Sequence, residues 1–245
     1  MENIKTKLLI SICEKGKEKK LFKYLKRNKI TYNLTINGQG TASSSLMEYF
    51  GLTEVKKEVI LSVIPEVLEG KILYDFHNKY EIYKPGHGIA FTTSITSATR
   101  YLSNIYSNIN VKEKIKVDND KEYELIVLIV SEGYSSVAMT AAKRKMAGGG
   151  TLIRGIGLGT KEAKKFLGLT IEPEKDVVLI LTDKENKKSV MEEITNEVGL
   201  SHEGRGICFS IPVDSVVGLS ENIKFDDFIH HSTFVFFDCS FIFTN

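Results

Sequence analysis

One stretch of this sequence occurs twice, and this duplication constrains the fold more than any other feature. A Gly-x-Gly-Thr run occupies residues 38–41 and recurs at 157–160, and a Gly-x-Gly-Ile run occupies 86–89 and recurs at 204–207. The two runs keep their order, and their copies are about 118 residues apart, which is the signature of an internal repeat. The sequence therefore predicts two copies of one small unit.

Composition limits the class of protein. Of the 245 residues, 42% are hydrophobic and 26% are charged, as in ordinary globular proteins. A net charge of +2 gives no field that would attract nucleic acid, so no nucleic-acid partner is expected. The cysteines, Cys13, Cys208 and Cys239, form no C-x-x-C pair, and residues 1–5 carry no apolar signal sequence. Since no run of 18 apolar residues occurs, these features predict a cytoplasmic protein without a membrane span.

Hydrophobic periodicity gives each copy the order β-α-β-β-α-β. In the first copy we expect strands at 7–13, 30–36, 58–64 and 89–95, with helices at 17–28 and from Pro65 to Phe76. In the second we expect strands at 124–130, 151–154, 176–181 and 207–213, with helices at 135–146, where Val137 should face inward, and around 190–198. Good helix formers at 160–167 also predict a helix inside the second loop.

This order is the split βαβ, or ferredoxin-like, arrangement, so the predicted fold class is α+β with two tandem ferredoxin-like units. The predicted boundaries are 1–95 for the first domain, 96–121 for a linker with a short element at 115–117, and 122–219 for the second domain.

Residues 220–245 form a Phe-rich tail without a counterpart in the first copy. Two interpretations stay open: an extra strand packed on a sheet or oligomer face, or a tail that docks on a partner or touches a membrane. Its phenylalanines are Phe225, Phe228, Phe234, Phe236, Phe237, Phe241 and Phe243.

Few residues have the pattern of a catalytic or metal site. Of the five histidines only His87 stands in a repeated motif, and Arg205 replaces it in the second copy. A position that holds either His or Arg suits an anion contact better than a general base. No H-x-x-H or C-x-x-C pair suggests a metal, and Cys13 and Cys208 lie in predicted strands as structural thiols. We expect neither an enzyme nor a metal site.

The glycine-rich turns are the better candidates for a ligand site, because successive backbone N–H groups in such turns can hold an anion and glycine permits close approach. Their spacing fits neither a P-loop nor a Rossmann fingerprint. The alternative, that these glycines only form tight turns, stays open. The candidate ligand-binding residues are Gly38, Gln39, Gly40, Thr41, Gly86, His87, Gly88, Arg154, Gly157, Gly159, Thr160, Gly204, Arg205 and Gly206.

Both halves resemble the P-II-like nitrogen regulatory signalling proteins, and the chain as a whole resembles a tandem, two-copy member of that group. The resemblance rests on the runs at 38–44, 51–52 and 85–91 in the first copy and at 148–151, 157–160, 166–168 and 204–217 in the second. It departs from the family where Ile89 and Ile207 replace a lysine and where Gly218-Leu219-Ser220 replaces two basic residues.

The resemblance implies a trimer or trimer-like ring, mobile loops after the second strand of each copy, and a nucleotide held between neighbouring domains. ATP, ADP, AMP or a cyclic nucleotide is the implied cofactor, and another small anion or no ligand remain alternatives because of the departures. It also implies a small-molecule sensor that regulates a protein partner, such as a transporter or metabolic enzyme. The alternative function is a ligand-free scaffold that docks partners through its loops or tail.

Overall fold

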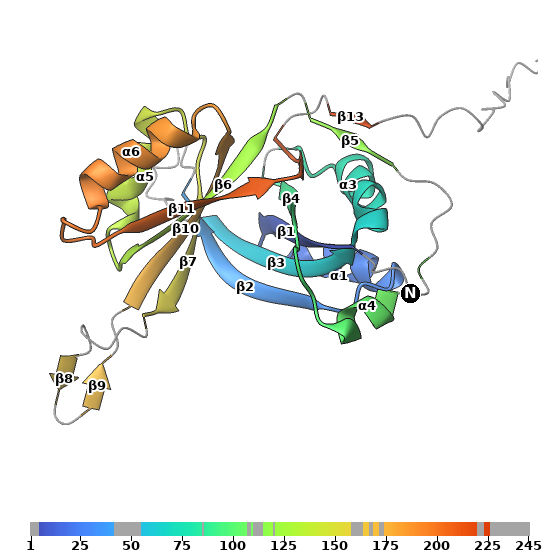
Figure 1. Cartoon of the computed structure of the whole chain (residues 1–245), viewed down its shortest axis with the longest axis horizontal. Helices are drawn as coiled ribbons and strands as arrows, with labels where there is room; N and C mark the ends of the chain where they lie inside the picture. Colours follow the sequence, from blue (N-terminus) through green and yellow to red (C-terminus); the bar gives the residue numbers. More distant parts are fainter. Residues whose placement is uncertain are drawn as a thin grey trace, which may run out of the picture.

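The computed structural model describes residues 5–41, 55–84, 86–106, 109, 115–119, 121–157, 164–166, 169–171, 174–219 and 223–225. These residues form a mixed α+β fold around one nine-stranded antiparallel sheet, with helices on its outer face (Figure 1). The strand order is β11-β6-β10-β7-β2-β3-β1-β4-β12. None of the helices in the described residues has the length and apolar sequence needed to cross a membrane.

The first half of the sheet has the strand order β2-β3-β1-β4. Its central strands, β1 and β3, alternate between side chains that face the helices and side chains that face the second half. Its elements are β1 (Thr6–Glu14), α1 (Glu18–Arg27), β2 (Asn33–Gly40), β3 (Val55–Pro65), the short helix η1 (Glu66–Leu68), α3 (Glu69–Asn78) and β4 (Gly88–Ser94).

The second half repeats this arrangement with the strand order β7-β10-β6-β11. The predicted order β-α-β-β-α-β is therefore confirmed in both halves, while the division into two domains stays a prediction. The elements are β6 (Tyr123–Ser131), α5 (Ser135–Arg144), β7 (Thr151–Ile156), β10 (Glu174–Asp183), α6 (Lys187–Val198) and β11 (Ile207–Val213).

Several smaller elements differ from the sequence predictions. The expected linker contains α4 (Arg100–Tyr106), which was not predicted, whereas β5 (Val117–Asp118) overlaps the short element predicted at 115–117. The fully buried Tyr106 at the end of α4 donates a hydrogen bond to the Val63 carbonyl at 2.6 Å. The helix expected at 160–167 is wrong for its described part, because β8 (Lys164–Phe166) pairs with β9 (Leu169–Ile171) as a hairpin. Val137 is 43% exposed rather than inward, since Ala138, Ala141 and Ala142 occupy the buried face of α5.

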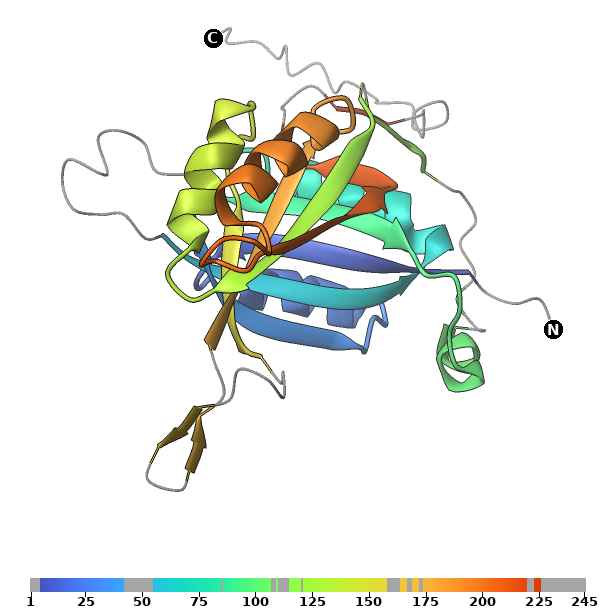
Figure 2. The same ribbon diagram turned by 60° about the vertical axis from the view of Figure 1, so that its left-hand side comes forward.

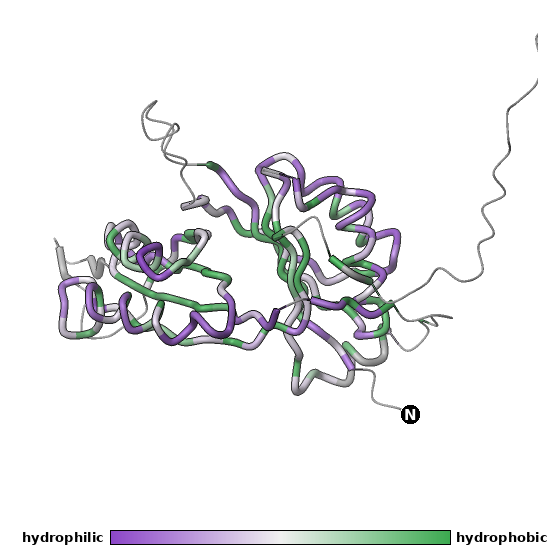
Figure 3. The backbone as a smooth tube through the Cα atoms, turned by 90° about the horizontal axis from the view of Figure 1, so that it is seen from above, coloured by the Kyte–Doolittle hydropathy of each residue, from purple (hydrophilic) through white to green (hydrophobic). Residues whose placement is uncertain are grey.

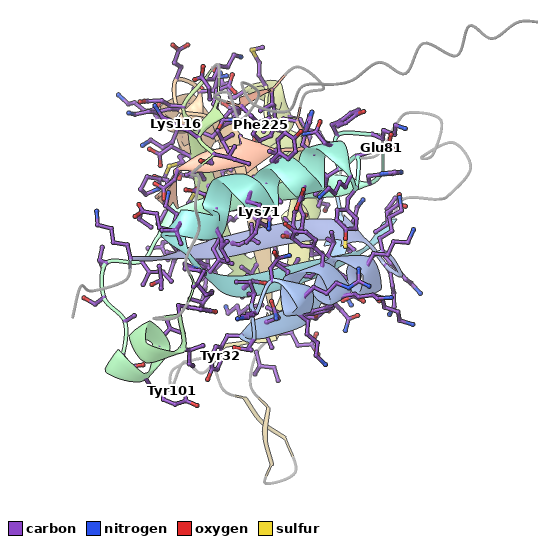
Figure 4. The ribbon with its side chains drawn as sticks, turned by 90° about the vertical axis from the view of Figure 1, so that its right-hand side faces the viewer. Tyr32, Lys71, Glu81, Tyr101, Lys116 and Phe225 are labelled. Carbon is purple, nitrogen blue, oxygen red and sulfur yellow. The ribbon has the colours of Figure 1, made fainter. Side chains whose placement is uncertain are left out.

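Helices cover the outer face of each half-sheet. In the first half, the Tyr24 hydroxyl on α1 donates a buried hydrogen bond of 2.6 Å to Asp75 on α3, and Lys71 donates to Asn28 at 3.4 Å. Figure 4 shows α1 and α3 side by side, with Lys71 on the visible face of α3. In the second half, α5 and α6 lie next to each other over the sheet (Figure 2). Helix packing therefore buries one face of each half-sheet.

The other faces of the two half-sheets bury each other. One apolar cluster contains Ile10, Val59 and Phe91 from the first half together with Leu125 and Val127 from the second. The hydrophobic stretches of the chain accordingly run through the strands of both halves (Figure 3). Because both faces of the central strands are apolar, the molecule has the layers helix, sheet, sheet, helix.

The sheet is continuous at one side and nearly closed at the other. β2 pairs with β7 where Gln39 lies opposite Leu152 and Gly40 lies opposite Thr151. On the other side, the chain leaves β11, turns at Asp214 and continues as β12 (Ser215–Val217), which pairs with β4 of the first half. β12 thus lies within the predicted second domain yet extends the half-sheet of the first.

A polar network fixes the turn at Asp214. Lys7 Nζ lies 2.7 Å from Glu69 Oε2 and 3.2 Å from Asp214 Oδ2, and the Ser94 hydroxyl also donates to Asp214 at 2.7 Å. Burial alone would lower the pKa of Lys7, but the hydrogen bonds and charges of Glu69 and Asp214 outweigh it and raise that pKa. Because the pKa of Lys7 is raised, its ion pairs with Glu69 and Asp214 stabilise the folded state at neutral pH. This contribution is lost as the pH rises through the folded-state pKa, which lies above 10.5.

Replacing Lys7 should show how much this network stabilises the fold. Lys7→Ala leaves two poorly solvated carboxylates without their cation, so we expect urea denaturation at pH 7 to show a loss of about 2–3 kcal/mol in the free energy of unfolding. Lys188→Ala is the matched control, because its side chain is 84% exposed beside Glu192 and should change stability by about 0.5 kcal/mol or less. Equal effects of the two substitutions would contradict a structural role for the network.

Candidate functional site: a glycine-rimmed cavity between the half-sheets

A cavity of about 500 Å³ opens between the two half-sheets, at the end where β1 and β2 finish and β4 begins. We call it the mouth cavity. Its floor is apolar and comes from both halves, and its rim contains glycines from three separate turns. The floor residues are Ile12, Val55, Ile89, Phe91, Leu125, Leu179 and Leu181, and the rim glycines are Gly40, Gly86, Gly88, Gly148, Gly149, Gly150 and Gly218.

The Gly86–Gly88 turn requires glycine for two physical reasons. Gly86 and Gly88 have φ angles of +78° and +137°, which other residues rarely adopt. A Cβ at Gly88 would also overlap the carbonyl oxygen of Ile12, and a Cβ at Gly86 would lie 2.5 Å from Glu14 Oε1. The glycines therefore let the turn before β4 lie against the end of β1.

The seam between β2 and β7 supplies the opposite side of the rim. Thr41 Oγ1 donates to the Gly150 carbonyl at 3.0 Å and accepts from the Gly150 N–H at 2.8 Å, while the Thr41 N–H donates to the same carbonyl at 2.9 Å. A Cβ at Gly150 would lie 3.0 Å from Val178 Cγ1 and 3.1 Å from the Leu179 carbonyl oxygen. Gly40, Thr41 and Gly150 therefore join the two halves at the cavity.

Charged groups stand at the rim of this apolar pocket. Lys57, Lys84 and Glu14 contribute charged side chains to its lining, and Tyr83 contributes a polar one. Lys84 lies 2.7 Å from Glu81 and lowers the pKa of that carboxyl through a hydrogen bond. Lys57 contributes an ammonium group to the same lining. The cavity suits a ligand with an apolar or aromatic body and an acidic end.

Three predicted residues lie instead in a second, outer groove of about 420 Å³. Gly38, Gln39 and Arg154 line it together with Asn37, Leu152, Lys15, Lys56 and Lys57. Here β2 extends beyond the predicted 30–36, because Gly38 lets β7 approach: a Cβ there would lie 3.0 Å from Thr151 Cγ2. The loop expected to start at Gly38 therefore starts three residues later.

The glycine turn of the second half does not reach the mouth cavity. The Gly206 N–H donates to the Val198 carbonyl at 2.6 Å, and the Ser131 N–H donates to the Gly204 carbonyl at 2.9 Å. A Cβ at Gly204 would lie within 3.2 Å of side-chain atoms of Val198 and Tyr134. Arg205 in this turn has a φ of +44°. The turn packs against its own half, and its expected role as an anion contact stays a prediction.

The remaining predicted residues are dispersed. His87 Nδ1 lies 3.3 Å from the Tyr80 carbonyl oxygen, and the His87 backbone N–H donates to the Lys84 carbonyl, so His87 belongs to the turn that holds Gly86 and Gly88. Gly157 follows β7, and Gly159 and Thr160 lie outside the described residues. Among the described residues, no group of three or more His, Cys, Asp or Glu side chains could hold a metal ion.

Sequence reasoning missed two contributors to the cavity. Gly148–Gly150 follow the helix predicted at 135–146, and nothing in the local sequence shows that they face Gly40 across the seam. The position of Lys57 could have been inferred from the sequence. Side chains alternate between the two faces of a strand, so Lys57 lies on the same face as the buried Val59, two residues further along β3.

No protein-family model matches the chain, and no curated protein matches it. Among solved structures, the chain is similar to an unknown protein from Galdieria sulphuraria, with 12% identity over 86% of this chain and 99% of that one and a TM-score of 0.27. It is also similar to a mutant chlorite dismutase from Candidatus Nitrospira defluvii, with 8% identity over 88% and 93% of the two chains and a TM-score of 0.23. At these TM-scores neither likeness carries an argument about function.

The seam at Thr41 can be tested by removing its hydroxyl. Thr41→Val removes both side-chain hydrogen bonds to Gly150 and leaves the Gly150 N–H without its acceptor. We therefore expect the free energy of unfolding to fall by about 1–2 kcal/mol in urea denaturation. Thr41→Ser keeps the hydroxyl and should recover most of this loss. If both variants unfold alike, the hydrogen bonds at the seam do not stabilise it.

The two described cysteines should react slowly with alkylating reagents. Burial, with a smaller contribution from Glu18 and Glu58, raises the pKa of Cys13 to about 12, and burial raises the pKa of Cys208 to about 11. At pH 8 we therefore expect iodoacetamide to label both thiols at least about tenfold more slowly than an exposed cysteine, as followed by peptide mass spectrometry. Rapid labelling of either thiol would contradict this prediction and make that cysteine a candidate nucleophile.

Proposed function

We propose that this protein is a cytoplasmic, non-enzymatic sensor of the P-II-like type, in which the mouth cavity binds a small anionic molecule with an apolar body. A nucleotide fits this description. The single observation that supports the proposal is the cavity itself, because it gathers Gly40, Gly86 and Gly88 of the first half with Gly148–Gly150 of the second over an apolar floor.

The chemistry of the cavity matches the two parts of a nucleotide. A base would lie on the floor formed by Phe91, Ile12 and Leu179, where it is removed from water. Phosphate oxygens would accept hydrogen bonds from backbone N–H groups of the glycine turns and face the ammonium groups of Lys57 and Lys84. The glycine rim permits a closer approach than larger residues would.

Signalling would follow from where the cavity lies in the chain. Gly40 and Val55 both line it, and they stand on either side of residues 42–54, where the sequence predicts a mobile loop. A ligand that contacts both ends would favour one arrangement of that loop, and the loop would then engage or release a protein partner such as a transporter or metabolic enzyme. A homo-oligomer of trimer-like form is part of this proposal.

The test is a thermal-shift and calorimetric screen of nucleotides, cyclic dinucleotides and small organic anions on three proteins. We expect a ligand at 100 times its Kd to stabilise the wild type by about 2.7 kcal/mol. Lys57→Glu should weaken that ligand at least tenfold, because it reverses the charge at the rim of the mouth cavity.

Lys56→Glu is the matched control. It makes the same change of charge one residue away, on the outer groove instead of the mouth cavity, so it should keep the wild-type affinity. Loss of binding in both variants would move the site to the outer groove, because both lysines line that groove. A folded protein that binds nothing in the screen would refute the sensor and favour the scaffold.

A further inference from the structure

The exposed face of α1 carries a row of positive charges. Residues 15–29, which contain α1 and its flanking turns, hold eight Lys and Arg residues and one acidic residue, although the whole chain has a net charge of only +2. The apolar face of α1 is buried on the first half-sheet. We call the exposed cations of α1 and of the turn that follows it the lysine stripe: Lys19, Lys20, Lys23, Lys26, Arg27 and Lys29.

The equivalent helix of the second half shows that the fold does not need this charge. α5 has the same length as α1 and buries the same helical positions of the repeat. Its exposed residues Ser136, Val137 and Thr140 occupy the positions that are equivalent to the first three lysines of the stripe. Because an uncharged face serves in the second copy, these lysines are not required for α1 to form or to pack.

The helix beside α5 neutralises its cations, whereas the helix beside α1 adds positive charge. In the second half, Arg144 of α5 lies 2.9 Å from Glu193 of α6. The equivalent of Glu193 on α3 is Asp75, which is only 3% exposed and forms an ion pair with Lys79 at 2.7 Å. α3 also presents the exposed Lys71 next to α1 (Figure 4). The positive charge of the stripe therefore extends onto α3.

The stripe opposes the stability of its own helix. Like charges three or four positions apart on a helix repel each other. Lys23 stands four positions after Lys19 and three after Lys20, and it stands three before Lys26 and four before Arg27. A charged face that destabilises its helix and is not needed for packing indicates a binding surface for an anionic partner.

The form and composition of this face favour a membrane with anionic lipids over a nucleic acid. α1 lies flat beside α3 (Figure 4), so the stripe belongs to a broad helical layer and not to an element that could enter a groove of a duplex. All but one of its cations are lysines, which lack the bidentate fork that arginine offers to bases and phosphates. Clusters of this size on an amphipathic helix are typical of surfaces that bind anionic lipids.

Two exposed tyrosines lie beyond the C-terminal end of α1. Tyr32 and Tyr101 are 40% and 69% exposed, and their hydroxyl groups share a hydrogen bond. Figure 4 shows both on the side of the molecule that carries α1 and α3. Tyrosine is enriched at the boundary between lipid and water, because its ring is apolar and its hydroxyl is polar.

We propose that the lysine stripe and Lys71 hold the protein on the surface of a bilayer that contains anionic lipids, with Tyr32 and Tyr101 at the lipid boundary. The ammonium groups attract the negative headgroups across a distance that salt limits, so the association is peripheral and depends on ionic strength. The proposal is independent of whether the mouth cavity binds a ligand.

Cosedimentation of the full-length protein with lipid vesicles tests the proposal. At about 0.1 M salt, the wild type should sediment with phosphatidylcholine vesicles that contain about one third phosphatidylserine, and about 1 M salt should release it. Vesicles of phosphatidylcholine alone should not bind it. Lys19→Gln/Lys20→Gln/Lys23→Gln should bind the acidic vesicles about a hundredfold more weakly, because each lysine near such a surface contributes about a factor of five.

The matched control is Lys143→Gln/Lys145→Gln/Lys188→Gln, which removes the same charge from exposed lysines on the helical side of the second half. It should keep the wild-type affinity within about threefold, and urea denaturation should show that both triple variants are folded. Equal weakening in the two variants, or a wild type that stays in solution with acidic vesicles, would overturn the proposal. Tighter binding to a fluorescent DNA or RNA duplex than to the vesicles would also overturn it and assign the stripe to nucleic acid.

Discussion

The fold depends on the burial of two apolar sheet faces against each other. Each half-sheet covers one face with its own pair of helices, and the opposite faces, which include Ile10, Val59, Leu125 and Val127, have no such cover. Because exposed faces of this size are costly in water, the halves must pack together. The seam at Thr41 and the turn at Asp214 then hold the two sheets in one register.

The mouth cavity is a consequence of this packing. Two twisted sheets that join along one seam diverge toward their ends, and the space between them is filled only where side chains meet. At the end where β1 finishes, glycines stand on the rim because the Gly88 turn must lie against Ile12 and Gly150 must lie against β10. The same glycines that permit the packing also line the cavity, so the structural and the binding interpretations of these turns are compatible.

The element order of both halves and the apolar strands could be predicted from periodicity, because residues such as Ile60 and Ile180 belong to uninterrupted β-branched and aliphatic runs. The end of β2 could not, since Gly38-Gln39-Gly40 has the sequence of a turn and becomes strand through pairing with β3 on one side and β7 on the other. Helix propensity at 164–166 was likewise overridden by hairpin pairing, and α4 was missed because its seven residues carry no clear periodicity.

The sequence by itself determined the duplication, the two sets of six elements and the glycine turns, because these depend on local pattern and on the chain's own repeat. Only the tertiary structure decided which turns meet. It brought Gly86 and Gly88 to Gly148–Gly150 and left Gly204–Gly206 packed within the second half, although the two turns are alike in sequence. The physical reason is that the pairing of β2 with β7 and of β12 with β4 is a long-range contact, which no local pattern records.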